Sequence, residues 1–163
     1  MMAHLVPLEL HQVEQAKAVI RQVWREHFGA HADPDVRTFL DRPEAFPDLD
    51  TWQQTYVPPR GLFLVALDAD RVVGTGGIRP METHTAELTR MFLLPKYRGR
   101  GWGRSIAEHL IQFARHTGYR SVRLGTNKQL IASHALYRSL GFRDIPAYEP
   151  GGERVAYYME LSL

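Results

Sequence analysis

The chain has 163 residues, a formal net charge of +2 and no cysteine. A chain of this length suits one hydrophobic core, so we expect residues 1–163 to form a single domain. The lack of cysteine excludes disulfides, thiolate metal ligands and a cysteine nucleophile. The near-neutral charge argues against nucleic-acid binding, although the sequence pI is about 9.0.

The sequence contains no membrane or export signal that we recognise. No apolar run approaches the ~20 residues that a bilayer-spanning helix requires. The first ten residues include Pro7 and Glu9 and lack the apolar segment of a secretory signal. We therefore expect a cytoplasmic protein without a membrane partner.

The eight histidines raise the question of a metal site. His27 and His31 are four residues apart, but Gly29 lies between them and no neighbouring carboxylate completes a helical HExxH zinc motif. We therefore expect no metal.

The first third of the chain is predicted to contain a strand, a helix and an irregular segment. Residues 4–10 are compatible with a short strand. From His11, apolar residues recur at steps of three and four, which predicts an amphipathic helix that ends at Gly29. Residues 30–59 contain five prolines and are predicted to be irregular, with short helical pieces at 36–40 and 49–56.

Strands and helices alternate in the rest of the chain. Strands are predicted at 61–67, 72–78, 86–94, 121–125, 142–145 and 155–161, and helices at 102–116 and 131–140. Gly118 is expected to cap the first of these helices. This order predicts an α/β fold with a mixed, mostly antiparallel central sheet of about six to seven strands and helices on both faces.

A basic, glycine-rich turn after Pro95 joins an apolar strand to the helix that begins near Trp102. The first turn of a helix has unpaired N–H groups and a partial positive charge, so it can bind an anion. Glycine lets the backbone approach a phosphate closely, and arginine adds charge. The glycines and arginines of the turn are Gly99, Gly101, Gly103, Arg98, Arg100 and Arg104. This pattern predicts a ligand that carries a diphosphate.

Other readings of this turn fit less well. A Walker P-loop needs Lys-Ser/Thr after its last glycine, whereas Arg104-Ser105 follows here at the wrong spacing. A Rossmann fingerprint is GxGxxG in an early βαβ unit, whereas this GxGxG comes late in the chain. An RGG-type RNA-binding segment would be longer and disordered. A solvated surface turn is the remaining alternative.

Two motifs resemble the GCN5-related N-acetyltransferase (GNAT) family. Arg98-x-x-Gly101-x-Gly103 matches the (Gln/Arg)-x-x-Gly-x-(Gly/Ala) signature, which binds the diphosphate of acetyl-CoA in that family. The later segment 135–142, ALYRSLGF, is similar to the family helix that ends Leu-Tyr-x-x-x-Gly-Phe, and 87–91 resembles the strand before the signature. The order of elements agrees over nearly the whole chain. The resemblance implies a GNAT fold and acetyl-CoA as co-substrate.

The resemblance also implies which residues contact acetyl-CoA. In the family, backbone groups of the strand before the signature pair with the pantetheine arm, and the signature follows. The implied contacts are Met91, Phe92, Leu93, Arg98, Gly99, Arg100, Gly101, Trp102, Gly103, Arg104 and Asn127. Ser133, one turn before Tyr137 on the same helix face, could substitute for the asparagine as a cofactor contact. Asn127 departs from the family pattern, because the usual asparagine stands about seven residues before the tyrosine, where this chain has Leu130.

Tyr137 and Glu87 are the candidate catalytic residues. Tyr137 matches the family tyrosine that protonates the departing thiolate, and a phenol is a suitable donor. Its alternative role is packing against the sheet. Strand alternation places Glu87 on the same face as Met91 if no bulge intervenes. Glu87 could be the base, a salt-bridge partner of Arg79 or Arg90, or an acceptor-binding anion.

The acceptor is an amine that the sequence does not identify. The segment after the first helix is rich in acidic residues, namely Asp33, Asp35, Asp41, Glu44, Asp48 and Asp50. An acidic rim would attract a cationic small-molecule or peptide amine, whereas a solvated loop would have no such role. Trp52 and Tyr56 could line this pocket or belong to the core.

These features predict an N-acetyltransferase that transfers acetyl directly to a primary amine, without an acetyl-enzyme. An acyl-CoA-binding regulatory domain without turnover is the alternative. A nucleic-acid-binding module built on the arginines of the turn is a weaker one. The terminal strand 155–161 could lie at a homodimer interface.

Overall fold

The computed structural model describes residues 3–29 and 34–163 and contains a seven-stranded sheet. The strands are β1 (His4–Pro7), β2 (Leu62–Asp68), β3 (Arg71–Glu82), β4 (Thr85–Leu93), β5 (Ser121–Asn127), β6 (Arg143–Ile145) and β7 (Ala156–Ser162). They lie in the order β1-β2-β3-β4-β5-β7-β6. β4 and β5 are parallel, and the other neighbouring pairs are antiparallel. The predicted mixed, mostly antiparallel sheet is therefore confirmed.

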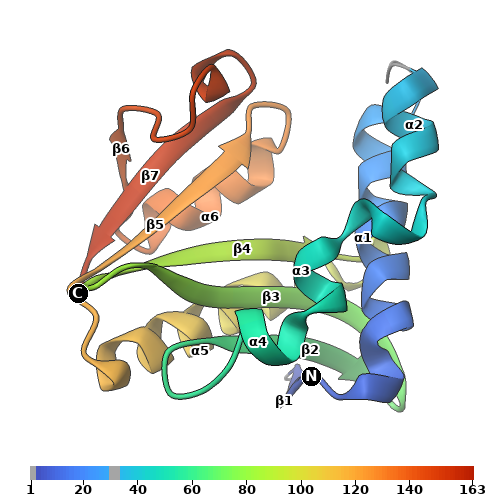
Figure 1. Cartoon of the computed structure of the whole chain (residues 1–163), viewed down its shortest axis with the longest axis horizontal. Helices are drawn as coiled ribbons and strands as arrows, with labels where there is room; N and C mark the ends of the chain where they lie inside the picture. The colour runs from blue at the N-terminus through green and yellow to red at the C-terminus, as the bar shows by residue number, and fades with distance from the viewer. Residues whose placement is uncertain (1–2, 30–33) are drawn as a thin grey trace.

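Helices cover both faces of this sheet (Figure 1). They are α1 (Val13–Phe28), α2 (Pro34–Leu40), α3 (Pro47–Asp50), α4 (Trp52–Thr55), α5 (Trp102–Thr117) and α6 (Ile131–Ser139). Two adjacent glycines of β3 distinguish the faces. A side chain at Gly76 would meet Ile106 and Leu110 of α5, whereas one at Gly77 would meet Tyr56, which follows α4. α5 therefore packs on one face and the α4 region on the other.

Residues 34–59 contain more regular structure than their prolines suggest. Phe46 and Leu49 are fully buried and anchor this segment in the core. The single helical piece predicted at 49–56 is instead two one-turn helices, α3 and α4, because the backbone of Thr51 leaves the helical conformation (φ −111°, ψ 29°). The predicted end of the first helix at Gly29 is confirmed, whereas His31 and Asp33 lie outside the described residues.

The terminal strand β7 is an interior strand of the sheet. It pairs with β5 on one side and with β6 on the other. β6 covers the outer edge of β7 only at 158–160, so a homodimer interface at this strand stays a prediction.

Candidate active site

The parallel strands β4 and β5 separate soon after they pair. Their pairing covers only 85–87 of β4 against 121–123 of β5. Beyond that point the two strands diverge and leave a V-shaped opening in the sheet (Figure 1). A cavity of about 310 Å³ lies at this end of β4, and α1, α5 and α6 contribute to its walls. The divergence is what makes room for a ligand between two neighbouring strands.

The glycine-rich turn forms one wall of this cavity. Gly101 is the N-cap of α5 and has φ +82°, and Gly99 has φ +73°. L-residues with a side chain rarely adopt such angles, so the turn requires glycine there. No atom would lie within 4 Å of a Cβ at either position. Gly99, Gly101, Gly103 and the first residues of α5 line the cavity, so the start of the helix faces the space that the sequence predicts for a diphosphate.

The arginines of this turn have different environments. Arg98 lines the cavity, but its Nη1 and Nη2 donate to Glu26 of α1 at 2.6 and 2.9 Å, and its Nε donates to the Leu93 carbonyl at 3.0 Å. Arg104 also lines the cavity and donates to Glu108 and to Ser139. Arg100 is exposed and is not part of the cavity wall. The charge near the glycines is therefore partly neutralised by carboxylates that the motif did not reveal.

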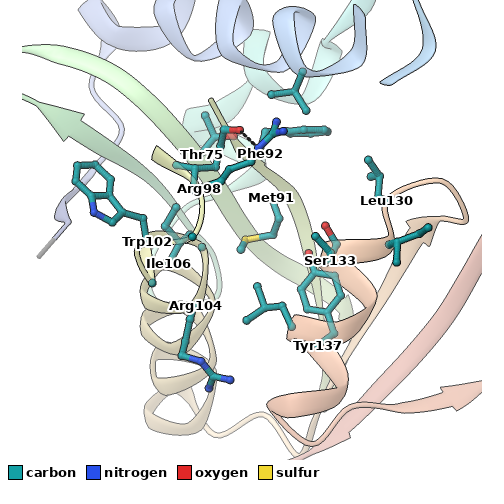
Figure 2. Close-up of a pocket in the computed structure, with 18 of the residues that line it drawn as sticks. Thr75, Met91, Phe92, Arg98, Trp102, Arg104, Ile106, Leu130, Ser133 and Tyr137 are labelled. Atoms are coloured by element: carbon teal, nitrogen blue, oxygen red, sulfur yellow. Dashed lines mark hydrogen bonds between the residues drawn. The ribbon is translucent and has the colours of Figure 1, made fainter. Parts of the chain in front are cut away.

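Trp102 is the first residue of α5. Its side chain is 2% exposed and its ring lies 5.2 Å from that of Tyr97. Figure 2 shows the indole directed away from Met91 and Tyr137. The side chain thus anchors the start of α5 in the core, beside the cavity that this residue helps to line.

A bulge in β4 interrupts the alternation of side chains that we expected along this strand. Arg90 has φ +55°, and the register between β3 and β4 shifts here, so that two steps on β3 oppose three on β4. The Thr75 hydroxyl donates to the Arg90 carbonyl at 2.7 Å and fixes the bulge. Met91 packs on the α5 face and lines the cavity with Phe92 and Leu93. The prediction that Glu87 shares a face with Met91 required a strand without a bulge, and the bulge places the two side chains on opposite faces.

Tyr137 projects from α6 into the same cavity (Figure 2). Its side chain is 5% exposed and packs edge-on against Phe142, with ring centroids 5.7 Å apart. This burial raises the pKa of the Tyr137 phenol well above its ordinary value, so the hydroxyl stays protonated at neutral pH. Ser133, one turn earlier on α6, also lines the cavity. The two α6 residues chosen from the sequence therefore face the predicted cofactor contacts on β4.

Asn127 does not line the cavity. Its side-chain oxygen accepts from the Gln129 N–H at 2.9 Å, and its carbonyl accepts from Nε2 of the buried His134 at 2.8 Å. The cavity wall near this loop includes Leu130 instead, at the position where the family pattern has its asparagine. Asn127 therefore shapes the loop between β5 and α6, and a direct contact between its side chain and the cofactor has no support in this geometry.

Glu87 lies on the opposite face of the sheet from the Met91 side chain, in a group of polar side chains. Its Oε1 accepts from Nε and Nη2 of Arg79 at 3.0 and 2.7 Å, and its Oε2 accepts from the Tyr148 hydroxyl at 3.2 Å. The salt bridge to Arg79 that the sequence allowed is confirmed. Opposite charges at directly paired positions of a hairpin are a signal that the sequence contains. Tyr148 comes from a loop that gave no such signal.

Asp48 and Arg90 form a second ion pair on this face. Arg90 donates to both carboxylate oxygens of Asp48 at 3.1 and 2.7 Å, and the Tyr56 hydroxyl donates to the same carboxylate at 2.6 Å. Burial alone would raise the pKa of Asp48, but the hydrogen bonds and charge of Arg90 outweigh it and hold that pKa below its ordinary value. Burial and the charge of Asp48 together raise the pKa of Tyr56.

The acidic segment is partly neutralised by internal pairs. Lys17 binds Asp50 at 2.5 Å, Arg25 binds Asp41, and Arg90 binds Asp48. These contacts account for three of the six acidic residues; among the described side chains Glu44 has no ion-pair partner, and the side chains of Asp33 and Asp35 are not described. The idea of an acidic rim that attracts cations is therefore weakened.

The described residues contain neither a cluster of metal ligands nor a membrane-spanning helix. Within 3–29 and 34–163, no group of three or more His, Cys, Asp or Glu side chains is arranged to hold a metal ion. No helix in this part of the chain is long and apolar enough to cross a membrane.

Comparison with known proteins identifies the family. The family model described as "Acetyltransferase (GNAT) family" matches residues 18–142. The chain therefore belongs to the GNAT family, and the cavity, the glycine turn and the tyrosine of α6 belong to an acetyltransferase fold.

Two curated relatives bear on the activity. The uncharacterised N-acetyltransferase YjgM of Escherichia coli K12 is 36% identical over 130 residues, which are 78% of this chain and 74% of that protein. The human N-acetylaspartate synthetase is 37% identical over 113 residues, which are 69% of this chain and 37% of that longer protein. The chain therefore spans little more than a third of the synthetase.

Solved structures share the fold over nearly the full length. A GNAT-family acetyltransferase from Staphylococcus aureus has a TM-score of 0.81 at 20% identity and covers 98% of each chain. The PaiA N-acetyltransferase from Thermoplasma acidophilum, solved in complex with coenzyme A, has a TM-score of 0.79 at 18% identity and covers both chains completely. At these identities the likeness concerns the fold.

Proposed function

We propose that the protein transfers an acetyl group from acetyl-CoA directly to a primary amine of a small molecule or peptide. The observation that carries this proposal is a single cavity that unites the glycine turn, the end of β4 and Tyr137. The turn offers helix N–H groups to a diphosphate, and the strand offers backbone groups to the pantetheine arm. The open space at the Gly99 and Gly101 positions fits a ligand that approaches the backbone closely.

In the proposed reaction, the amine nitrogen attacks the thioester carbonyl carbon and the carbon–sulfur bond breaks. Glu87, directly or through water, takes the proton that the amine loses. Tyr137 gives its proton to the sulfur and recovers one from solvent. Burial raises the pKa of Tyr137, so its phenol is protonated and available as a proton donor at neutral pH.

The comparisons support an acceptor that bears an amine and are compatible with an amino acid. The synthetases among the relatives are named for N-acetylaspartate, whose acceptor part carries carboxylates. The internal pairing of Asp41, Asp48 and Asp50 gives less support to a polyamine or an aminoglycoside than the sequence alone did.

The test is release of coenzyme A thiol from acetyl-CoA across a panel of amino acids, polyamines, aminoglycosides and lysine peptides. Because the chain has no cysteine, a thiol reagent reports only the released coenzyme A. We expect at least one amine to give turnover that falls strongly in Tyr137→Phe. Tight coenzyme A binding with no turnover on any amine would instead favour the regulatory domain, and absence of coenzyme A binding would overturn the proposal.

A further inference from the structure

The Arg79–Glu87 ion pair lies on the sheet face opposite α5 and is partly exposed to solvent. The Arg79 side chain is 36% exposed and that of Glu87 is 14% exposed. Arg79 uses Nε and Nη2 to bind one oxygen of Glu87, and within the described residues its Nη1 has no hydrogen-bond partner. A guanidinium has five N–H donors in a fixed plane, so further donors remain for a second carboxylate.

Glu87 also has unused hydrogen-bonding capacity. Its Oε2 accepts one long hydrogen bond, from Tyr148, and its Oε1 accepts the two from Arg79. An ionised carboxylate has about four acceptor sites. An ammonium group could therefore bind Glu87 without displacing Arg79. Glu87 does not itself line the cofactor cavity, but Val23 and His27 of α1 do, and α1 lies on the same face of the sheet as α3, opposite α5 (Figure 1). The cavity therefore reaches the face of the sheet on which an amine at Glu87 would lie.

The charge around this pair is balanced. Asp48 and Arg90, on the same face, neutralise each other through two hydrogen bonds. Arg79 and Glu87 thus present one positive and one negative group side by side, 2.7 Å apart at their closest atoms. A polyamine would find only one carboxylate there and would face the guanidinium. A zwitterion, by contrast, matches both charges.

We propose that the acceptor is an α-amino acid, with its carboxylate bound by Arg79 and its amino group directed to Glu87. This inference rests on the proposed acetyl transfer and specifies the substrate class of the same site. Arg79 is then a specificity-determining residue, because it recognises a group that does not react. Tyr148 is a positioning residue that holds the second oxygen of Glu87.

The test compares free amino acids with their matched amides, which keep the amine and side chain but lose the carboxylate. With wild-type protein we expect L-aspartate, L-glutamate or another free amino acid to have a kcat/KM at least about tenfold above that of its amide, as for loss of one charged hydrogen-bonding partner. Equal or better activity on the amides, or activity only on polyamines, would overturn the inference. This comparison needs no variant and so does not depend on the folding of a mutant.

Substitutions of Arg79 test whether this residue recognises the carboxylate of the acceptor. Arg79→Gln should raise KM for the free amino acid by about tenfold or more and leave KM for the amide nearly unchanged. Arg79→Lys keeps the positive charge but loses the planar guanidinium that can bind a carboxylate through two N–H groups. Its KM for the free amino acid should therefore lie between those of the wild type and Arg79→Gln. Arg71→Gln is the matched control, because Arg71 is an exposed arginine at the opposite end of the same strand, β3, and does not line the cavity. An equal change of KM for acid and amide in Arg79→Gln would contradict the assignment.

These outcomes separate the inference from the function on which it rests. Turnover on amides or polyamines alone contradicts the amino-acid acceptor and leaves acetyl transfer intact. No thiol release from any acceptor, with or without a carboxylate, contradicts the proposed acetyl transfer itself.

Discussion

Two regions beside β4 differ in the kinds of residue that form them. Around the end of β4, where Met91 packs towards α5, the cavity is lined largely by apolar side chains from α1, α5 and α6 and by the glycine turn. On the other side, Arg79, Glu87, Arg90 and Asp48 form ion pairs that tyrosine hydroxyls extend. Under the proposed function, the backbone of the turn and of β4 would bind acetyl-CoA, and the charged side chains would select the acceptor amine.

The bulge at Arg90 lets one strand serve both faces. Without it, strict alternation would place Glu87 and Met91 on the same side of the sheet. The extra residue turns Met91 towards α5 and leaves Arg90 with Asp48 on the opposite side. The predictions below test the contrast between the two faces, beginning with the largest expected effect.

Removing the Tyr137 hydroxyl should impair chemistry and spare binding. We expect Tyr137→Phe to lower kcat by about 100-fold, the usual scale for loss of a general acid, with little change in KM for acetyl-CoA. Tyr119→Phe is the control, because this buried tyrosine donates to the Arg60 carbonyl away from the cavity. A kcat in Tyr137→Phe equal to that of the control would reduce Tyr137 to a packing residue.

The raised pKa of Tyr137 adds a pH test. An acid catalyst works only while it is protonated, and a pKa above the ordinary value keeps it protonated through neutral and mildly alkaline pH. We therefore expect that deprotonation of Tyr137 causes no fall in kcat below about pH 10. Any fall in kcat below that pH should persist in Tyr137→Phe. A decline near neutral pH that disappears in this variant would contradict the burial argument.

Breaking the ion pair on the polar face should cost stability. Asp48→Asn leaves Arg90, which is 22% exposed, without its charged partner, and we expect a loss of about 2 kcal/mol in the free energy of unfolding. Asp144→Asn is the control, because its pair with Arg138 is exposed and should contribute little. Denaturant titration of both variants measures the difference.

The same pair should make stability depend on pH in one direction. Asp48 has a pKa held below its ordinary value in the folded protein, so its contribution is fully present above the ordinary pKa and is lost as pH falls through the folded one. The gap in stability between wild type and Asp48→Asn should therefore be largest near neutral pH and shrink towards pH 3 and below. A constant gap across this range would contradict the assignment.

A side chain on the glycine turn should weaken cofactor binding. Gly101 has φ +82°, so Gly101→Val imposes strain of about 1–2 kcal/mol and places methyl groups where the diphosphate is expected. We predict a Kd for coenzyme A about tenfold or more higher. Gly118→Val is the control, because Gly118 has φ +94° at the far end of α5. Equal loss of affinity in both variants would assign the effect to strain alone.

The smallest predicted effect concerns the link between α1 and the turn. Glu26→Gln removes the charge that holds Arg98, and we expect the Kd for coenzyme A to rise about threefold, because a partly exposed ion pair contributes modestly. Glu14→Gln, on the same helix and far more exposed, should leave the Kd unchanged. Tighter binding in Glu26→Gln would show instead that Glu26 competes with the diphosphate for Arg98.

Features encoded in the local chain could be predicted from the sequence. Apolar periodicity gave α5, and the glycines and arginines marked the turn that opens it, because such a turn has strict backbone requirements. Features that depend on long-range contacts could not. Glu26 meets Arg98 across 72 positions of the chain, and the bulge at Arg90 depends on its register with β3 and on the Thr75 hydroxyl.

Several side chains that the sequence analysis selected for ligand binding are occupied by ion pairs or hydrogen bonds within the protein. The acidic residues after α1 were conspicuous by composition, but their cationic partners Lys17 and Arg25 lie on α1, and Arg90 lies on β4. Asn127 had the right residue type, but the loop after β5 directs its side chain to a backbone N–H of its own turn. Composition shows which charges are present, whereas folding decides which of them remain available to a ligand.

The central claim is that coenzyme A binds between the separating strands with its diphosphate on the glycine turn. The most direct measurement is the change in backbone amide NMR shifts of ¹⁵N-labelled protein on titration with coenzyme A. The largest changes should fall at Gly99, Gly101, Gly103 and the end of β4, with little change at Gly118 and Gly151. Saturable binding whose shifts avoid the turn, or no binding at all, would contradict the claim.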